Sequence, residues 1–255
     1  MKTPLYLLWV LLISVVETSK AEILFGVYNP ARINTVTGRG ASSSSEDWNY
    51  LNSLAKDGQG RLFSVSQGQL VQIDPYALTL TPVLTLHGLG GFTGLAFSPA
   101  GELFAVQRGP GRDDPLYRID TLTGNVTTVG EIGFYRLSDI AYSPSGILYG
   151  WSGLYGLITI DPQTGRGTDV NASVGAPAEI QALTFGSDGT LYGARDALFR
   201  IDPATGVPVQ IGAGGYSDIR GLAVIPEPSL VRLMSLGLCG LLLQMWHRRK
   251  FQRSR

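Results

Sequence analysis

Between residues 22 and 225 the chain is a succession of short apolar runs, each followed by a polar turn. Runs such as LFAV (103–106) and LYGA (191–194) combine aliphatic and aromatic residues in segments too short for a helix, which favours strands. The turns between them carry Gly, Pro, Asp and Ser, which are the residues that tight turns require. The pattern predicts an all-β domain of many short strands.

The runs recur with a period of about 40 residues. Leucines at equivalent positions are separated by 38, 41, 45 and 43 residues: Leu24, Leu62, Leu103, Leu148 and Leu191. A companion run precedes each of the last four, and a fifth companion, RGLAV, ends at Val224. One unit reads GLAF, LFAV, LYRID and VTTVG (94–130), which is four strands. Four antiparallel strands in such a period are typical of a propeller blade.

A turn of the form Asp-Pro-x-Thr-Gly (DPxTG) lies between the third and fourth runs of a unit. Proline presets the backbone of the turn, and glycine supplies the positive φ that ends it. We interpret the first residue as a cap for backbone N–H groups; these residues are Asp74, Asp120, Asp161 and Asp202, with Asn34 in the first unit. They recur once per unit without the dense spacing of a calcium loop, so no metal is expected.

The alignment of the units predicts how the ring closes. Val224 falls where Phe97, Tyr142 and Phe185 fall, so the last unit stops after its first strand. Residues 22–27 begin at the position of a second strand. The two ends therefore share one blade, and residues 22–225 form a five-bladed β-propeller without open sheet edges. This domain lacks WD40 signatures and resembles the divergent bacterial propellers with Leu-Tyr and Ile-Asp-Pro motifs.

Both ends of the chain predict export. Residues 1–21 read as a signal peptide, with Lys2, an apolar stretch from Pro4 to Val16, and small residues before a cleavage point at Glu22. At the other end, residues 229–246 are mostly apolar. As a helix this segment would be about 27 Å long, which is enough for one transmembrane helix. A cationic cluster follows it: Arg248, Arg249, Lys250, Arg253 and Arg255.

Residues 226–255 resemble the PEP-CTERM sorting signal. The motif Pro226-Glu227-Pro228 precedes the apolar segment and the basic tail, in the order typical of that family. Arg232 within the apolar segment, and uncharged residues among the basic ones, depart from the pattern. The resemblance implies an inner-membrane precursor, processing by an exosortase-type enzyme, and delivery to the cell envelope or the exterior. The alternative is a plain tail anchor after a chance motif, on a purely structural protein.

The net charge of the domain and its content of reactive residues exclude several classes of function. Residues 22–228 carry 12 Lys and Arg against 19 Asp and Glu, a net charge of −7, which argues against nucleic acid as a partner. The single cysteine, Cys239, lies in the C-terminal segment. No nucleophile elbow, zinc-protease or phosphate-loop motif is present. We therefore expect that the protein is not an enzyme and that it has neither catalytic residues nor a cofactor.

The topology predicts two groups of candidate residues. First-to-second and third-to-fourth turns are expected on one face, and the longer loops on the opposite face. The candidate ligand face on those loops comprises Trp48, His87, Asp113, Asp114, Tyr135 and Trp151. A candidate channel ring lies at the starts of the innermost strands: Asn52, Thr93, Ser138, Gln181 and Arg220. The competing interpretation is that these residues cap the channel or occupy loops.

These observations predict an exported envelope or extracellular-matrix protein whose propeller is a binding or structural module. Its ligand would be an extracellular polysaccharide or a protein. The alternative is a propeller hydrolase or lyase acting on extracellular polysaccharide. That activity would need a metal or a His/Asp cluster at the channel mouth, for which the sequence offers Asp113, Asp114, Asp139 and His87.

Overall fold

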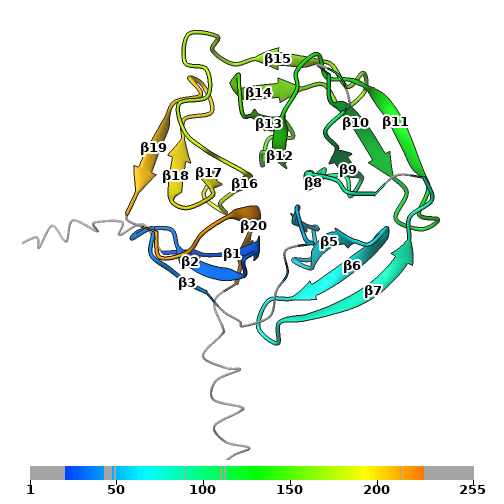
Figure 1. Ribbon diagram of the computed structural model, residues 1–255, viewed down its shortest axis with the longest axis horizontal. Coiled ribbons are helices and arrows are strands. Elements are labelled where there is room, and N and C mark those ends of the chain that lie inside the picture. Colours follow the sequence, from blue (N-terminus) through cyan, green and yellow to red (C-terminus); the bar gives the residue numbers. More distant parts are fainter. Residues whose placement is uncertain are drawn as a thin grey trace, which may run out of the picture.

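The computed structural model describes residues 21–226, apart from residues 43–47, 49, 89, 110, 112 and 213. In this part the strands form five four-stranded antiparallel sheets around a central axis (Figure 1). The fold is the five-bladed β-propeller that the repeat predicts. Among these residues, no helix is long and apolar enough to cross a membrane. Residues 1–20 and 227–255, which hold most of the predicted signal peptide and sorting signal, lie outside the described residues.

Four blades are continuous in sequence, and we number them along the chain. From the axis outward, their strands are β4 (Ala55–Lys56), β5 (Leu62–Ser66), β6 (Gln69–Asp74) and β7 (Thr79–Thr85) in blade 1; β8 (Gly94–Phe97), β9 (Leu103–Val106), β10 (Pro115–Ile119) and β11 (Val126–Glu131) in blade 2; β12 (Leu137–Tyr142), β13 (Leu148–Ser152), β14 (Gly156–Ile160) and β15 (Gly167–Asp169) in blade 3; and β16 (Ala182–Phe185), β17 (Leu191–Ala194), β18 (Leu198–Ile201) and β19 (Pro208–Ile211) in blade 4.

Blade 5 is built from both ends of the described chain. Its order is β20 (Ile219–Ile225), β1 (Ile23–Tyr28), β2 (Ala31–Asn34) and β3 (Gly40–Ser42). Strand β1 pairs antiparallel with β20, with Ile23 opposite Ile225 and Phe25 opposite Ala223. The predicted closure by the N- and C-terminal strands is confirmed.

The hydrophobic core lies between the blades. The described residues form five buried clusters, one at each blade interface. Within β1, Leu24 packs toward blade 4 while Phe25 packs toward blade 1. Because both faces of an inner strand are covered, these strands read as continuous apolar runs rather than alternating ones.

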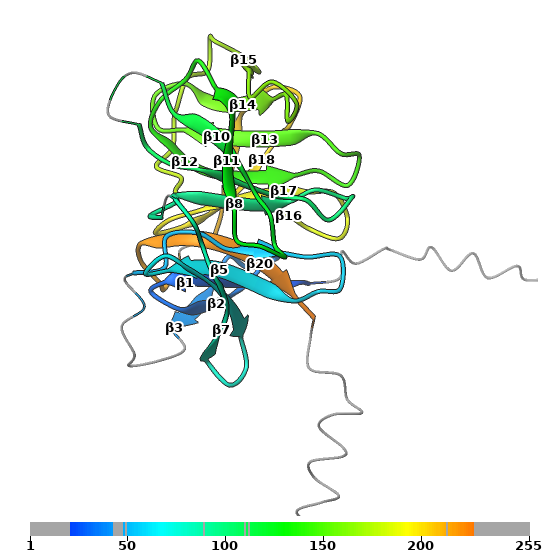
Figure 2. The ribbon, with the colours of Figure 1, turned by 90° about the vertical axis from the view of Figure 1, so that its right-hand side faces the viewer.

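The DPxTG turns hold neighbouring blades together. In Figure 2 the outermost strand β11 runs across the direction of the inner strands, so the blades are strongly twisted. This twist brings the turn of each blade to the rim; in blade 2, Gly124 O accepts a 2.8 Å hydrogen bond from His87 N, just beyond β7 of blade 1. A Cβ on Gly38 would lie 1.7 Å from Ile211 O of blade 4. In blade 4 the third-to-fourth turn at Asp202 still lies close to the first-to-second turn at Asp188, as expected for one shared face.

The predicted capping role of the turn aspartates is confirmed. Asp74 Oδ1 accepts hydrogen bonds from the N–H groups of Tyr76 and Ala77 at 2.8 and 2.9 Å. Equivalent N–H bonds, with threonine hydroxyls, lower the pKa of Asp120, Asp161 and Asp202. Within the described residues, no three His, Cys, Asp or Glu side chains are grouped to hold a metal ion.

Candidate functional site

The two ends of the blades differ in what they carry. We call the end with the first-to-second-strand turns the turn end, and the opposite end the loop end. Strand β1 begins and β20 finishes at the turn end, on the right-hand side of Figure 2. There Pro226 is exposed, and the hydroxyl of Tyr76 donates a hydrogen bond to its carbonyl. Both ends of the described chain therefore lie at the end of the propeller opposite the loop end.

The five predicted channel-ring residues begin the inner runs at the loop end, where the side chains of four of them join neighbouring blades. The hydroxyl of Thr93 donates to Leu137 O at 3.0 Å, and that of Ser138 donates to Ile180 O at 2.9 Å. Arg220 Nη1 donates to Asn52 Oδ1 at 3.0 Å. Gln181 is half-buried. These contacts tie neighbouring blades together around the axis.

One residue further along the inner runs, the axis is occupied by a carboxyl group. Asp139 is fully buried; its Oδ2 accepts from Leu183 N at 2.8 Å and its Oδ1 from Ile140 N at 2.9 Å. The N–H of Leu95 also donates to it, so the group links blades 2, 3 and 4. Burial raises the pKa of Asp139 well above the ordinary range, against the opposing effect of these N–H groups. Buried in this way, Asp139 is not accessible for a reaction at the channel mouth.

An ion cluster lies at the loop end, where blades 4, 5 and 1 meet. Arg220 donates from Nη2 to Asp218 Oδ2 at 3.0 Å, and its guanidinium lies 3.6 Å from the ring centre of Tyr28. Arg195 pairs with Glu179, and its Nε lies 3.9 Å from Asp218 Oδ1. Tyr28 and Asp218 have φ of 80° and 51°. Non-glycine residues in this strained region are enriched at functional sites.

An aromatic cluster lies at the loop end of blade 3. The ring of Tyr155 packs edge-on against Phe134 and Tyr135, with centroids 5.1 and 6.0 Å apart. Two buried polar side chains fix the loops that carry these rings. Ser152 Oγ donates to Tyr135 O at 2.8 Å and accepts from the N–H of Tyr155. Asp114 accepts from Leu137 N at 2.7 Å. The partly exposed rings are thus presented on a rigid support.

The structure separates the residues predicted for the ligand face. Trp48 and Trp151 are 2% and 0% exposed because they pack between blades, and Asp114 is 1% exposed because it organises the loops. These three residues present no surface to a ligand, so that prediction is wrong for them. Asp113 and Tyr135 lie together around the 132–136 loop, where Asp113 Oδ1 accepts from Gly133 N at 2.5 Å. His87 is exposed near the rim of blade 2 and belongs to neither cluster.

Sequence reasoning missed several members of both clusters. Tyr28, Arg195 and Asp218 lie far apart in the chain, and no local pattern connects them. Tyr155 lies in the β13–β14 turn and has no equivalent in the other units. A signal did exist for Asp139. At its place in the repeat the other units have Ser53, Gly94, Ala182 and Gly221, so a single acid among small residues marks the axis.

Comparisons with known proteins agree with the fold. No protein-family model matches the chain, and no curated protein matches it. One similar solved structure comes from work on the de novo evolutionary emergence of a symmetrical protein shaped by folding constraints; it is 20% identical, covers 81% of this chain and 100% of its own, and has a TM-score of 0.54. A chain of a nidogen/laminin complex is 11% identical, covers 81% and 98%, and has a TM-score of 0.55. At these identities the likeness shows the propeller fold alone.

Proposed function

We propose that the protein is an exported, non-enzymatic module of the cell envelope or extracellular matrix that binds its ligand at the loop end. The observation that carries this proposal is the pairing of β1 with β20. It brings both ends of the described chain to the turn end, so a tether that follows Pro226 would start opposite the loop end. The aromatic and ion clusters lie at the loop end, fixed by buried and partly buried hydrogen bonds.

The C-terminal segment is proposed to be a PEP-CTERM sorting signal, supported by the order of motif, apolar segment and basic tail in residues 226–255. We expect an inner-membrane precursor and a mature protein that has lost the residues after the PEP motif. Intact-mass measurement of protein from the envelope tests this. Retention of residues 229–255 in the mature protein would contradict processing and leave a tail anchor.

The direction of display is tested by labelling single cysteines in a Cys239→Ser background. Gly111→Cys places the thiol at the loop end, and Ser145→Cys places it in a first-to-second turn at the turn end; both sites are exposed. In the membrane-anchored precursor we expect a bulky maleimide to label residue 111 much faster than residue 145. Equal rates in the anchored precursor would remove the support for loop-end display.

Ligand binding is tested by probing arrayed glycans with the full chain in detergent. We expect a bound glycan whose signal falls about tenfold in a Tyr155→Ala variant, because loss of a central aromatic contact typically costs more than 1 kcal/mol. Leu122→Ala, at an exposed rim position, is the control. An equal signal from both variants would mean that the aromatic cluster is not the binding surface.

A further inference from the structure

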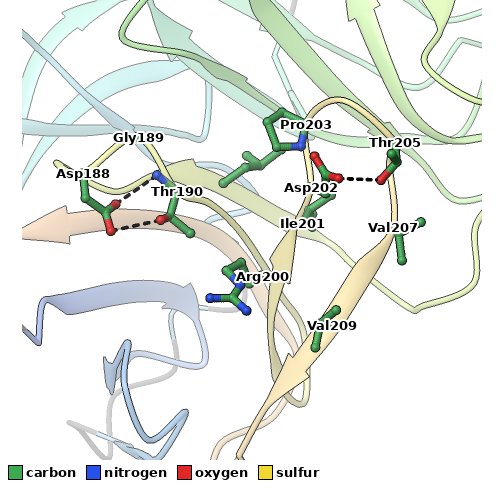
Figure 3. A pocket seen from close by; sticks show the side chains of 11 residues that line it. Asp188, Gly189, Thr190, Arg200, Ile201, Asp202, Pro203, Thr205, Val207 and Val209 are labelled. Atoms are coloured by element: carbon green, nitrogen blue, oxygen red, sulfur yellow. Dashed lines mark hydrogen bonds between the residues drawn. The ribbon is translucent and has the colours of Figure 1, made fainter. Parts of the chain in front are cut away.

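An open groove of about 640 Å³ lies on blade 4, away from the aromatic and ion clusters. One wall comes from the turn between β16 and β17, with Asp188 and Thr190, and the other from β18, β19 and the turn between them (Figure 3). Arg200 lies between the two walls. The groove has the size of a site for a small ligand.

Arg200 is an unpaired cation in this groove. Its side chain is exposed and makes no hydrogen bond or ion pair with any residue that the structure describes. Two other blades have arginine at the equivalent position of the third strand, and both are engaged. Arg32 of blade 5 donates from Nη2 to Pro75 O at 2.7 Å, and Arg118 of blade 2 pairs with Glu102 at 3.3 Å.

Blade 2 shows what blade 4 lacks. Arg118 lies opposite Phe104 in the sheet, and Glu102 precedes Phe104 by two residues. Arg200 lies opposite Tyr192, and the residue two places earlier is Thr190. At this position of the third strand, Arg118 of blade 2 therefore has a carboxylate partner, while Arg200 of blade 4 has a shorter, uncharged neighbour. The groove occupies the region of the missing carboxylate.

The other residues that line the groove indicate which further groups a ligand would carry. Asp188 and Asp202 cap their own turns, accepting N–H bonds of 2.9 Å from Thr190 and Ala204. Each carboxylate oxygen has more than one acceptor site, so both groups retain capacity for further donors. Val207 and Val209 are 42% and 54% exposed and form an apolar wall. A matching ligand has one carboxylate, several hydroxyl donors and an apolar surface.

We propose that this groove binds an acidic saccharide through the carboxylate of a uronate unit. Arg200 pairs with the carboxylate in the way that Arg118 pairs with Glu102, and a planar guanidinium can hold it with two hydrogen bonds. Sugar hydroxyls donate to Asp188 and Asp202, and the C–H face of the ring lies on the two valines. An acidic peptide has the carboxylate but not the array of hydroxyl donors. The site is separate from the loop end and goes beyond the function proposed above.

The test is calorimetric titration of the full chain, in detergent, with trigalacturonate. Arg200→Gln is expected to weaken binding about ten- to a hundredfold, the usual loss for a charge-assisted hydrogen bond. Arg118→Gln is the matched control and is expected to bind like the parent. Thr190→Glu recreates in blade 4 the pair seen in blade 2, so its own carboxylate occupies Arg200 and binding falls by a similar factor while the fold is retained.

Three results would overturn the proposal: no binding of trigalacturonate, equal binding of its methyl ester, or unchanged binding by Arg200→Gln. Equal binding of triglutamate would overturn the assignment to a saccharide. Tyr155→Ala serves to separate the two sites. It is expected to leave this titration unchanged even where it abolishes binding at the loop end, so either proposal can fail without the other.

Discussion

The interface between blades 4 and 5 and the interface between blades 5 and 1 are built differently. At the first, Gly38 of a DPxTG turn lies so close to Ile211 O that no side chain fits, and the contact is backbone against backbone. At the second, the turn has Leu78 in place of glycine, with φ of 55°, and its side chain packs into the cluster that contains Phe25 and Trp48. Side chains therefore replace close backbone approach at the interface between blades 5 and 1.

The connectivity of the chain also sets blade 5 apart from the other blades. Interfaces between consecutive blades are held in place by the short connection between them, so a repeated turn motif is enough. Within blade 5, no chain connection joins the first two strands, because β20 and β1 come from opposite ends of the described chain. Arg220 bonded to Asn52, and Arg32 bonded to Pro75 O, add directional contacts between blade 5 and blade 1. Stability at the closure should depend on individual side chains.

The largest effect is expected from deletion of residues 22–27. The deletion removes β1 and with it Leu24, Phe25 and Val27, all fully buried. Burial of each such side chain stabilises by roughly 1.5–3 kcal/mol, and a whole domain has only about 5–15 kcal/mol. Circular dichroism melting should show no cooperative transition. Removal of residues 229–255 is the control, since strand β20 ends at Ile225; equal melting of the two truncations would contradict closure by β1.

The next effect concerns the axis, where blades 3 and 1 differ. Asp139→Ala leaves the buried N–H groups of Leu95, Ile140 and Leu183 without their acceptor, and should lower the free energy of unfolding by about 3 kcal/mol. Ser53→Ala changes the equivalent position of blade 1, where the hydroxyl is buried without a hydrogen-bond partner among the described residues. It should change stability by less than about 1 kcal/mol. Similar losses in urea unfolding would mean that Asp139 does not link the blades.

An effect of similar size separates close backbone approach from backbone strain. Gly38→Ala places a methyl group against Ile211 O at positive φ, and should cost about 3 kcal/mol. Gly101→Ala has φ of 87° in the parent but meets nothing within 4 Å, so only strain of about 1 kcal/mol remains. Thermal unfolding of both variants measures the difference. Equal costs would show that the interface between blades 4 and 5 tolerates a side chain.

The smallest expected effect is the coupling energy of the hydrogen bond between Arg220 of blade 5 and Asn52 of blade 1. Both Arg220 and Asn52 are half-buried, so their hydrogen bond should contribute about 0.5–1 kcal/mol. A double-mutant cycle with Arg220→Gln and Asn52→Ala measures it in urea unfolding. Additive losses would show that the two residues act independently, and that Arg220 stabilises blade 5 only through Asp218 and Tyr28.

Much of the fold could be predicted because each blade repeats the same local chemistry. The leucine anchors, the DPxTG caps and the missing second strand after Val224 fix blade number and closure. Burial of individual aromatic residues could not be predicted. Trp151 lies on a strand covered on both faces, while Tyr155, four residues later, is exposed. The ion cluster joins residues 28, 195, 218 and 220, which only ring closure brings together.

Native-state hydrogen exchange tests ring closure most directly, because it compares strands within one intact molecule. If β1 is an integral part of blade 5, its amides at Leu24 to Val27 open only with the whole domain. They should then exchange as slowly as those of β9 and β13, the second strands of blades 2 and 3. Exchange in β1 at least about a hundredfold faster, with β9 and β13 still protected, would show that blade 5 opens on its own and would contradict the account.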